Sequence, residues 1–188
     1  MNKPISRGTS GGFTLIELIV VITILGILAA VALPRFTSLQ RDARVAKLNA
    51  ARGAVVAASA LVHATYLARA GTTDIATMCG GAATNIAGTA AAPGTICTEN
   101  GLVNVVFGYP DATALATAGL LSAAGLTSVF NPTAADLLAE GYTYAMAGTT
   151  ATFGVVGAPT AATCVFTYTE PAAVNNGPVI TATTTTGC

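Results

Sequence analysis

The hydrophobic pattern of the chain begins with an almost unbroken apolar run over residues 13–33, which holds one charged residue, Glu17. At about 1.5 Å per residue a helix of this length spans about 31 Å, enough to cross the hydrocarbon core of a membrane. Residues 35–69 then place apolar side chains every three or four positions, which is typical of a helix. The sequence therefore predicts one helix that begins as a membrane span, continues beyond Pro34 and ends at Gly71.

The second half of this helix carries two apolar stripes. Leu48, Val55 and Val62 lie seven residues apart on one stripe, and small residues from Ala43 to Ala64 follow helical spacing on another. A helix that is apolar on most of its faces is buried on most of its faces. We therefore expect one face to pack on the chain's own head and another to pack on sister helices, because small side chains let helices approach closely.

After residue 71 the pattern changes to short alternating segments separated by turn residues, which is typical of strands. Residues 147–150 predict a hairpin turn, residues 111–140 predict one or two short helices, and residues 72–101 are expected to be irregular. The expected strands are residues 102–107, 142–146, 152–156 and 164–169, with 179–185 as an edge strand. Together they predict an α+β head, in which an antiparallel sheet of about four strands lies on the helix.

Composition and charge narrow the class of protein. Hydrophobic residues make up 53% of the chain and charged residues 9%, which argues against disorder. All eight Lys and Arg residues lie in residues 1–69 against two acids, whereas residues 70–188 hold six acids and no base. The neutral total argues against a basic nucleic-acid binder, and the asymmetry indicates that the two parts meet different surroundings.

Three interpretations of the N-terminal segment are open. The apolar run is a secretory signal cut after Ala32, or a plain membrane anchor, or a prepilin-type signal that is cut ahead of the run. Lys3 and Arg7 would hold the N-terminal side in the cytoplasm. A carboxylate inside a bilayer costs about 2.5–3.5 kcal/mol on insertion scales. Because a signal peptide or simple anchor gains nothing from Glu17, this residue favours an interpretation in which the carboxylate has a partner.

Residues 12–17, Gly-Phe-Thr-Leu-Ile-Glu followed by an apolar helix, resemble the processing signal of type IV pilins and related pseudopilins. The resemblance covers residues 8–36, including Gly26 and Pro34. Residues 33–44 are also similar, more loosely, to pilins of the mannose-sensitive haemagglutinin type. The resemblance implies a leader of residues 1–12, a transmembrane and assembly helix of 13–34, a helix of 35–70 that continues into the head, and a head of 71–188.

The same resemblance assigns roles to five residues. A prepilin peptidase would cut between Gly12 and Phe13 and methylate the new Phe13 amine. Glu17 would pair with the Phe13 amine of a neighbouring subunit, which offsets the cost of burying both charges and sets the register of assembly. The stretch between Gly26 and Pro34 would loosen in the assembled filament, because proline removes a backbone donor.

The function that this resemblance implies is structural. We expect a major subunit of a type IV pilus that polymerises for adhesion or surface attachment, with a type II secretion pseudopilin as the first alternative. The other alternative is a soluble periplasmic binding protein released after Ala32. The implied partners are copies of the chain in a helical homopolymer, prepilin peptidase, the assembly platform with its ATPase, and a host or abiotic surface ligand. The precursor would lie in the bacterial inner membrane and the product in an extracellular pilus.

The remaining sequence holds no common catalytic motif, so neither an enzyme nor a cofactor is expected. The four cysteines, an even number, lie in the exported part and predict two disulfides. Three pairings are possible, and the local one, Cys79–Cys97 with Cys164–Cys188, is favoured because each bond closes a short loop. The second bond also resembles the C-terminal disulfide loop of many pilins. A metal site is disfavoured because no C-x-x-C spacing occurs and His63 is distant.

Arg41, Arg44 and Lys47 lie three residues apart and form a basic strip on the predicted helix. Such a strip is either a solvated face or a surface that contacts the acidic head of another subunit.

Overall fold

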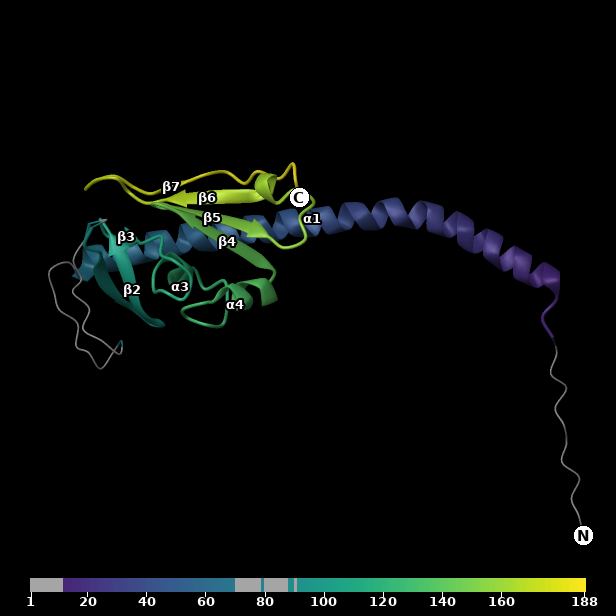
Figure 1. Ribbon diagram of the computed structural model, residues 1–188, viewed down its shortest axis with the longest axis horizontal. Coiled ribbons are helices and arrows are strands. Elements are labelled where there is room, and N and C mark those ends of the chain that lie inside the picture. The colour runs from purple at the N-terminus through teal and green to yellow at the C-terminus, as the bar shows by residue number, and fades with distance from the viewer. Residues whose placement is uncertain (1–11, 70–78, 80–87, 90) are drawn as a thin grey trace, which may run out of the picture. The chain divides into compact units, whose positions relative to one another are not determined.

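The computed structural model describes residues 12–69, 79, 88–89 and 91–188 (Figure 1). The chain divides into two compact units, residues 1–41 and residues 42–188, which are treated separately below. One α-helix, α1 (Leu15–Arg69), runs from the first unit into the second and contains Pro34 within its length. The predicted long helix is confirmed, while Gly71, expected to end it, lies outside the described residues.

The part of α1 in the second unit buries one of its two apolar stripes. Leu48, Val55 and Val62 are almost fully buried, and Ala51 and Ala58 fill the turns between them. The other stripe, from Ala43 to Ala64, is largely exposed. The larger side chains therefore face the head, and the small side chains are left on the open side of the helix.

A three-stranded antiparallel sheet follows the helix, in the order β1-β2-β3. Its strands are β1 (Gly94–Thr98), β2 (Gly101–Val106) and β3 (Tyr109–Pro110). The expectation that residues 72–101 are irregular is wrong for β1. Ile96 of β1 is buried against Val62 and Val105, and this non-local contact stabilises a strand whose Gly-, Ala- and Thr-rich surroundings gave little local signal.

A four-stranded antiparallel sheet in the order β4-β5-β6-β7 forms the second part of the head (Figure 1). Its strands are β4 (Tyr142–Ala147), β5 (Thr150–Val155), β6 (Val165–Thr169) and β7 (Val179–Ile180). The predicted hairpin is confirmed: β4 and β5 pair from Tyr142 and Val155 to Ala147 and Thr150. Gly148 in the turn has a φ of 60°, which glycine adopts without steric cost.

The edge strand β7 is shorter than the predicted 179–185. Beyond Ile180, the Thr181 hydroxyl accepts a hydrogen bond from the Thr167 backbone N–H at 2.9 Å, in place of a carbonyl. A side chain that takes over a ladder bond in this way ends regular pairing. Pairing returns as one isolated bridge between Val165 and Thr184.

Two short α-helices lie between the sheets, as the sequence predicts for residues 111–140. They are α3 (Leu120–Ala124) and α4 (Ala134–Ala139). Thr133 caps α4 in a reciprocal capping box with Asp136, whose carboxylate accepts the Thr133 N–H at 2.8 Å. This cap explains why a helix as short as α4 forms after Pro132. Elsewhere in the head, a single turn of 3₁₀ helix, η1 (Ala161–Thr163), precedes β6.

The main core lies between α1 and the inner face of the four-stranded sheet. Phe153 and Phe166 stack with ring centroids 4.9 Å apart, and Tyr168 is fully buried beside them. Leu48 and Val55 of α1 complete this cluster. The inner face of the sheet is therefore aromatic and tightly packed, so the residues that alternate with these side chains are directed outward.

Both disulfides follow the local pairing that the sequence favoured. Cys79 bonds Cys97 and Cys164 bonds Cys188, closing separations of 18 and 24 residues. The first bond attaches Cys79 to β1, and the second fixes the last residue of the chain beside β6. Each constrains the unfolded chain and so favours the folded head.

Candidate assembly site and its head

The helix α1 starts with a capping box between Thr14 and Glu17. A Glu17 carboxylate oxygen accepts the Thr14 backbone N–H and the Thr14 hydroxyl, both at 2.8 Å. The Glu17 N–H lies 3.3 Å from the Thr14 hydroxyl oxygen in return. The two residues satisfy the exposed donors at the helix start, so Glu17 has a partner within its own chain.

Every described residue of the first unit is exposed. Phe13 is 92% exposed, and the apolar side chains of α1 as far as Phe36 and Leu39 are open as well. A Cβ added at Gly26 would meet nothing within 4 Å. This surface is far larger than the apolar patches that soluble monomers tolerate, so it needs a membrane or other helices to cover it.

Among the described residues, α1 is the one helix long and apolar enough to cross a membrane, with a mean hydropathy of 2.8 over its most apolar window. This statement rests on the length and composition of the helix alone. A signal sequence near an N-terminus has the same length and composition.

Two comparisons with known proteins bear on the sequence motif at the start of α1. Residues 7–33 match the model of the prokaryotic N-terminal methylation motif. A stretch of 50 residues is 52% identical to the type IV narrow pilus major component PilA5 of Thermus thermophilus, a match that covers 27% of this chain and 43% of that relative. These matches support a type IV pilin. No solved structure matches the chain significantly.

Type IV pilins are structural subunits. The described part of this chain has a pilin-like architecture, with a long N-terminal helix followed by two small antiparallel sheets. The chain spans less than half the length of the relative that it matches, and the similarity lies in one limited stretch. The looser resemblance to the mannose-sensitive haemagglutinin type stays a prediction.

Two residues of the basic strip form hydrogen bonds within their own chain. Arg44 donates from Nε to the Cys188 backbone oxygen at 2.6 Å. Lys47 donates to the Glu140 backbone oxygen, and its ammonium lies 4.7 Å from the centre of the Tyr142 ring. Arg41 belongs to the first unit and is exposed. Two of the three cations thus bind their own head, and contact with another subunit stays a prediction.

Arg52 adds a third contact that sequence reasoning missed. Its Nε donates to the Thr181 backbone oxygen at 2.7 Å. Arg44, Lys47 and Arg52 all bind main-chain carbonyls of the head that lie 93 to 144 residues away. A hydrogen bond from a charged donor contributes more than a neutral one, so the three contacts fix the rotation of α1 against the head.

Glu170 forms the joint between the two sheets. It follows β6, is 7% exposed, and accepts the Ala112 backbone N–H at 2.7 Å. Burial, and after it the neighbouring Asp111 carboxyl, together raise the pKa of Glu170 to about 8, while the hydrogen bond from the Ala112 N–H opposes them. The folded head therefore favours the protonated form of Glu170 at neutral pH.

Two tyrosines hold the same segment from the four-stranded sheet. The Tyr168 hydroxyl donates to the Pro110 carbonyl at 2.7 Å, and the Tyr144 hydroxyl donates to the Thr113 carbonyl at 2.7 Å. Burial raises the pKa of both hydroxyl groups well above the usual value for tyrosine. Residues 110–113 are thus attached to β4, to β6 and to Glu170, which fixes the three-stranded sheet relative to its neighbour.

His63 is a packed side chain on α1. Its ring stacks on Tyr109 with centroids 3.9 Å apart, and Nδ1 lies 3.2 Å from the Gly108 carbonyl oxygen. Gly108 has a φ of 80°, and a Cβ there would lie 2.4 Å from the Tyr66 ring. The turn before β3 therefore requires glycine on two grounds, and it seats β3 on α1.

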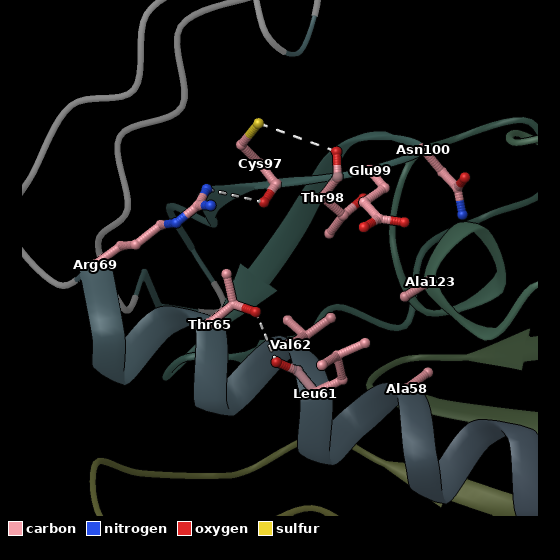
Figure 2. A pocket seen from close by; sticks show the side chains of 10 residues that line it. All are labelled: Ala58, Leu61, Val62, Thr65, Arg69, Cys97, Thr98, Glu99, Asn100 and Ala123. Atoms are coloured by element: carbon pink, nitrogen blue, oxygen red, sulfur yellow. Dashed lines mark hydrogen bonds between the residues drawn. The ribbon is translucent and has the colours of Figure 1, made fainter.

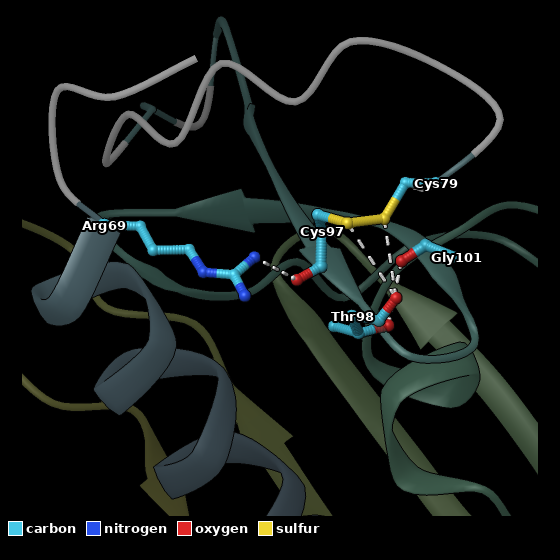
Figure 3. The surroundings of a disulfide bond; sticks show 5 residues. All are labelled: Arg69, Cys79, Cys97, Thr98 and Gly101. Carbon is cyan, nitrogen blue, oxygen red and sulfur yellow. Dashed lines mark hydrogen bonds between the residues drawn. A yellow bond between two sulfur atoms is a disulfide. The ribbon is translucent and has the colours of Figure 1, made fainter. Parts of the chain in front are cut away.

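A cavity of about 300 Å³ lies between the end of α1 and the turn that joins β1 to β2 (Figure 2). Leu61 and Val62 of the helix form its apolar wall, and Glu99 and Asn100 of the turn form its polar wall. Arg69 donates to the Cys97 carbonyl, 3.5 Å away, beside the Cys79–Cys97 bond (Figure 3). This hydrogen bond joins the helix side of the cavity to β1.

Sequence reasoning missed the capping box and the joint for different reasons. The signal for the cap was present, because Thr-x-x-Glu ahead of an apolar run is a known helix start. The joint had no local signal, since Glu170 is one of six scattered acids in residues 70–188. Its burial depends on Ala112, which is 58 residues away.

The joint predicts a pH dependence that Glu170→Gln removes. The unfolded carboxyl titrates near its ordinary value of 4.5 and the folded one near 8. The protonated form therefore stabilises the fold fully below about pH 4.5, and this stabilisation is lost as the pH rises to 8. We expect E170Q to melt with wild type at pH 4.5 and at a higher temperature at pH 9, measured by circular dichroism on the full chain in detergent.

The control for this measurement is Glu99→Gln, which changes an exposed carboxylate on the same head. E99Q should follow the wild-type melting temperature at both pH values. Equal pH dependence in wild type and E170Q would show that Glu170 does not control the joint.

Proposed function

We propose that this pilin is the major structural subunit of a type IV pilus, which is processed at its N-terminus, polymerises through α1 and serves surface attachment. One observation carries the proposal: an exposed apolar helix begins at Leu15, within residues 7–33 that match the methylation motif. A relative that is 52% identical over 50 residues is itself named the major component of a pilus. That match favours a pilus subunit over the secretion pseudopilin.

The exposed helix accounts for two successive locations. Before assembly the inner membrane would cover residues 13–34, with the leader of residues 1–12 on the cytoplasmic side. After assembly, sister helices would replace the lipid. The head of residues 71–188, with the preceding helix of 35–70, would face outward. Prepilin peptidase, the assembly platform and its ATPase are the partners that this sequence of events requires.

The part of α1 in the second unit also has a surface that suits polymerisation. The open side of α1 there presents small side chains, among them Ala46, Ala50, Gly53 and Ala57. Such residues let helix backbones approach closely, and the gain is in packing contacts. A contact between two different surfaces that does not close on itself repeats into a fibre. One subunit type can therefore build a filament with helices inside and heads outside.

Processing is tested by the mass of the mature chain. We expect filaments sheared from cells to yield a chain that begins at Phe13 and carries one N-terminal methyl group. The match of residues 7–33 to the methylation motif supports this expectation. Mass spectrometry of the intact chain and of its N-terminal peptide measures both. A chain that begins at Leu33 would instead mean release by signal peptidase and would overturn the proposal.

Glu17 is proposed to act between subunits, although it caps its own helix in the single chain. Cleavage before Phe13 creates an ammonium group at the start of α1, and both charges are costly to bury alone. A neighbouring subunit in the correct register would bring the Phe13 ammonium to Glu17. A subunit out of register would leave both charges unpaired, so the pair selects the register.

The two roles of Glu17 can be separated. Glu17→Gln keeps a side chain that serves at this position of a capping box but removes the charge, whereas Thr14→Ala removes the capping hydroxyl and keeps the charge. We expect E17Q cells to make processed subunit but at most about a tenth of the wild-type filament, and T14A cells to stay near wild type, since a lost cap costs about 1 kcal/mol. Shearing followed by immunoblotting measures filament yield, and the cell pellet shows the subunit.

The reverse result, with normal filaments from E17Q and few from T14A, would assign Glu17 to the helix cap alone. Loss in both variants with the subunit missing from the pellet would indicate a folding or insertion defect. Thr14→Ser, which keeps the capping hydroxyl, should then recover the filament yield of T14A.

Gly26 and Pro34 are proposed to mark a stretch of α1 that loosens on assembly. In the single chain the helix passes through both residues. Proline lacks the N–H that would bond the carbonyl four residues earlier, at Ala30, so this stretch has the fewest backbone bonds to lose. We expect filament density to show extended chain between the two residues, and continuous helical density there would contradict it.

A further inference from the structure

The outer face of the four-stranded sheet is an ordered array of small, uncharged side chains. Along β5 and β6, Ala151, Phe153, Phe166 and Tyr168 are buried in the core, so the residues between them point outward. We define the threonine face as the eleven residues that strand pairing places together on this side of the sheet: Thr143, Ala145, Ala147, Thr150, Thr152, Gly154, Val165, Thr167, Thr169, Val179 and Thr184. Gly154 itself is buried, because the side chains of Thr143 and Val165 cover its position.

Strand register arranges these residues in three rows. Thr143, Gly154, Val165 and Thr184 are paired across the strands in the first row. The second row holds Ala145, Thr152 and Thr167, and the third holds Ala147, Thr150, Thr169 and Val179. Neighbouring rows lie about 6.7 Å apart along the strands, and neighbouring residues of a row about 4.8 Å apart. The result is an array of methyl and hydroxyl groups, because none of the eleven residues has a bulky side chain.

Three of the six threonine hydroxyl groups of this face are hydrogen-bonded to a neighbouring threonine. The Thr150 and Thr169 oxygens lie 3.0 Å apart, and those of Thr167 and Thr181 lie 3.3 Å apart. Threonine is stiff at χ1 because it is branched at Cβ. Binding of a partner therefore immobilises few additional side chains, which lowers the entropic cost of binding.

The chemistry of the face restricts its partner. None of its eleven residues is charged, so it offers no attraction to nucleic acid or to an anionic lipid surface. It has no Leu, Ile, Phe or Trp to anchor a protein partner. The strand spacings give it an extent of about 14 Å by 13 Å, or about 200 Å². A stable protein interface needs about 800 Å² on each partner, so the face is too small for a second copy of the chain.

We propose that the threonine face binds an uncharged polysaccharide in ordered, packed sheets. Such a surface repeats hydroxyl groups and C–H patches, which can meet the hydroxyl and methyl groups of the face without burying a charge. Each contact is weak because it is small. This inference rests on the proposed function, since a filament that repeats the face along its length converts weak contacts into firm attachment.

Microcrystalline cellulose is the probe for the test, and sheared filaments are the sample. Thr152→Lys places a charged, longer side chain in the middle row, and we expect it to reduce the bound fraction by about tenfold, because each repeat along the filament loses its contact. Thr152→Val with Thr167→Val keeps the shape and removes two hydroxyl groups, and it should also bind less. The matched control is Thr117→Lys, an exposed threonine outside the face, which should bind like wild type.

Filament yield by immunoblot and electron microscopy is recorded for every variant, and binding is compared at equal filament mass. The full chain in detergent, immobilised on beads at high density, repeats the measurement without a filament. Wild-type beads that hold cellulose while cells make no filaments would overturn the proposed function and leave this inference standing. Filaments that form normally and ignore cellulose would overturn this inference alone.

Three further outcomes would also overturn it. One is equal binding by T152K and wild type. Another is wild-type binding to polystyrene that matches binding to cellulose, which would indicate apolar adhesion. The third is lateral bundling of filaments that T152K disperses while cellulose binding is unchanged, which would make the face a contact between copies of the chain.

Discussion

The exposed apolar surface of residues 13–33 is the constraint on which the remaining structure depends. An apolar helix of this length cannot stay in water, and lipid and sister helices are the two surroundings that satisfy its backbone and side chains together. On the proposed function, the chain passes from lipid to sister helices without exposing this helix to water. The capping box of Thr14 and Glu17 gives the helix a defined start.

The head is built to be rigid with few charges. Its cations come from α1 and bind main-chain oxygens, while the acid at its centre, Glu170, is buried and protonated at neutral pH. Two small sheets that share only a short segment would otherwise move against each other. Hydrogen bonds from Tyr144 and Tyr168 to that segment hold them together. A rigid head keeps its outer face at a constant position in each subunit.

Local patterns predicted the parts of the fold that local patterns control. The hairpin of β4 and β5 was readable because Tyr142 to Met146 alternate and a glycine turn follows. The strand β1 was not, because Ile96 is its one large apolar residue and acquires a partner only through Val62 and Val105. The basic strip could be recognised in the sequence, but the hydrogen-bond acceptors of its side chains could not. Arg44 and Lys47 donate to main-chain oxygens 144 and 93 residues away. The N-terminal motif could be read because processing acts on a linear stretch of sequence.

The attachment of α1 to main-chain oxygens has a consequence for variation. The helix recognises the carbonyls of Glu140, Thr181 and Cys188, and these carbonyls are unchanged when the side chains of Glu140 and Thr181 are replaced. Residues in the surface loops of the head can therefore be substituted while the hydrogen bonds that attach the head to α1 are preserved. On the proposed function, filaments of such variants would present different outer surfaces while α1 stays attached to the head in the same way.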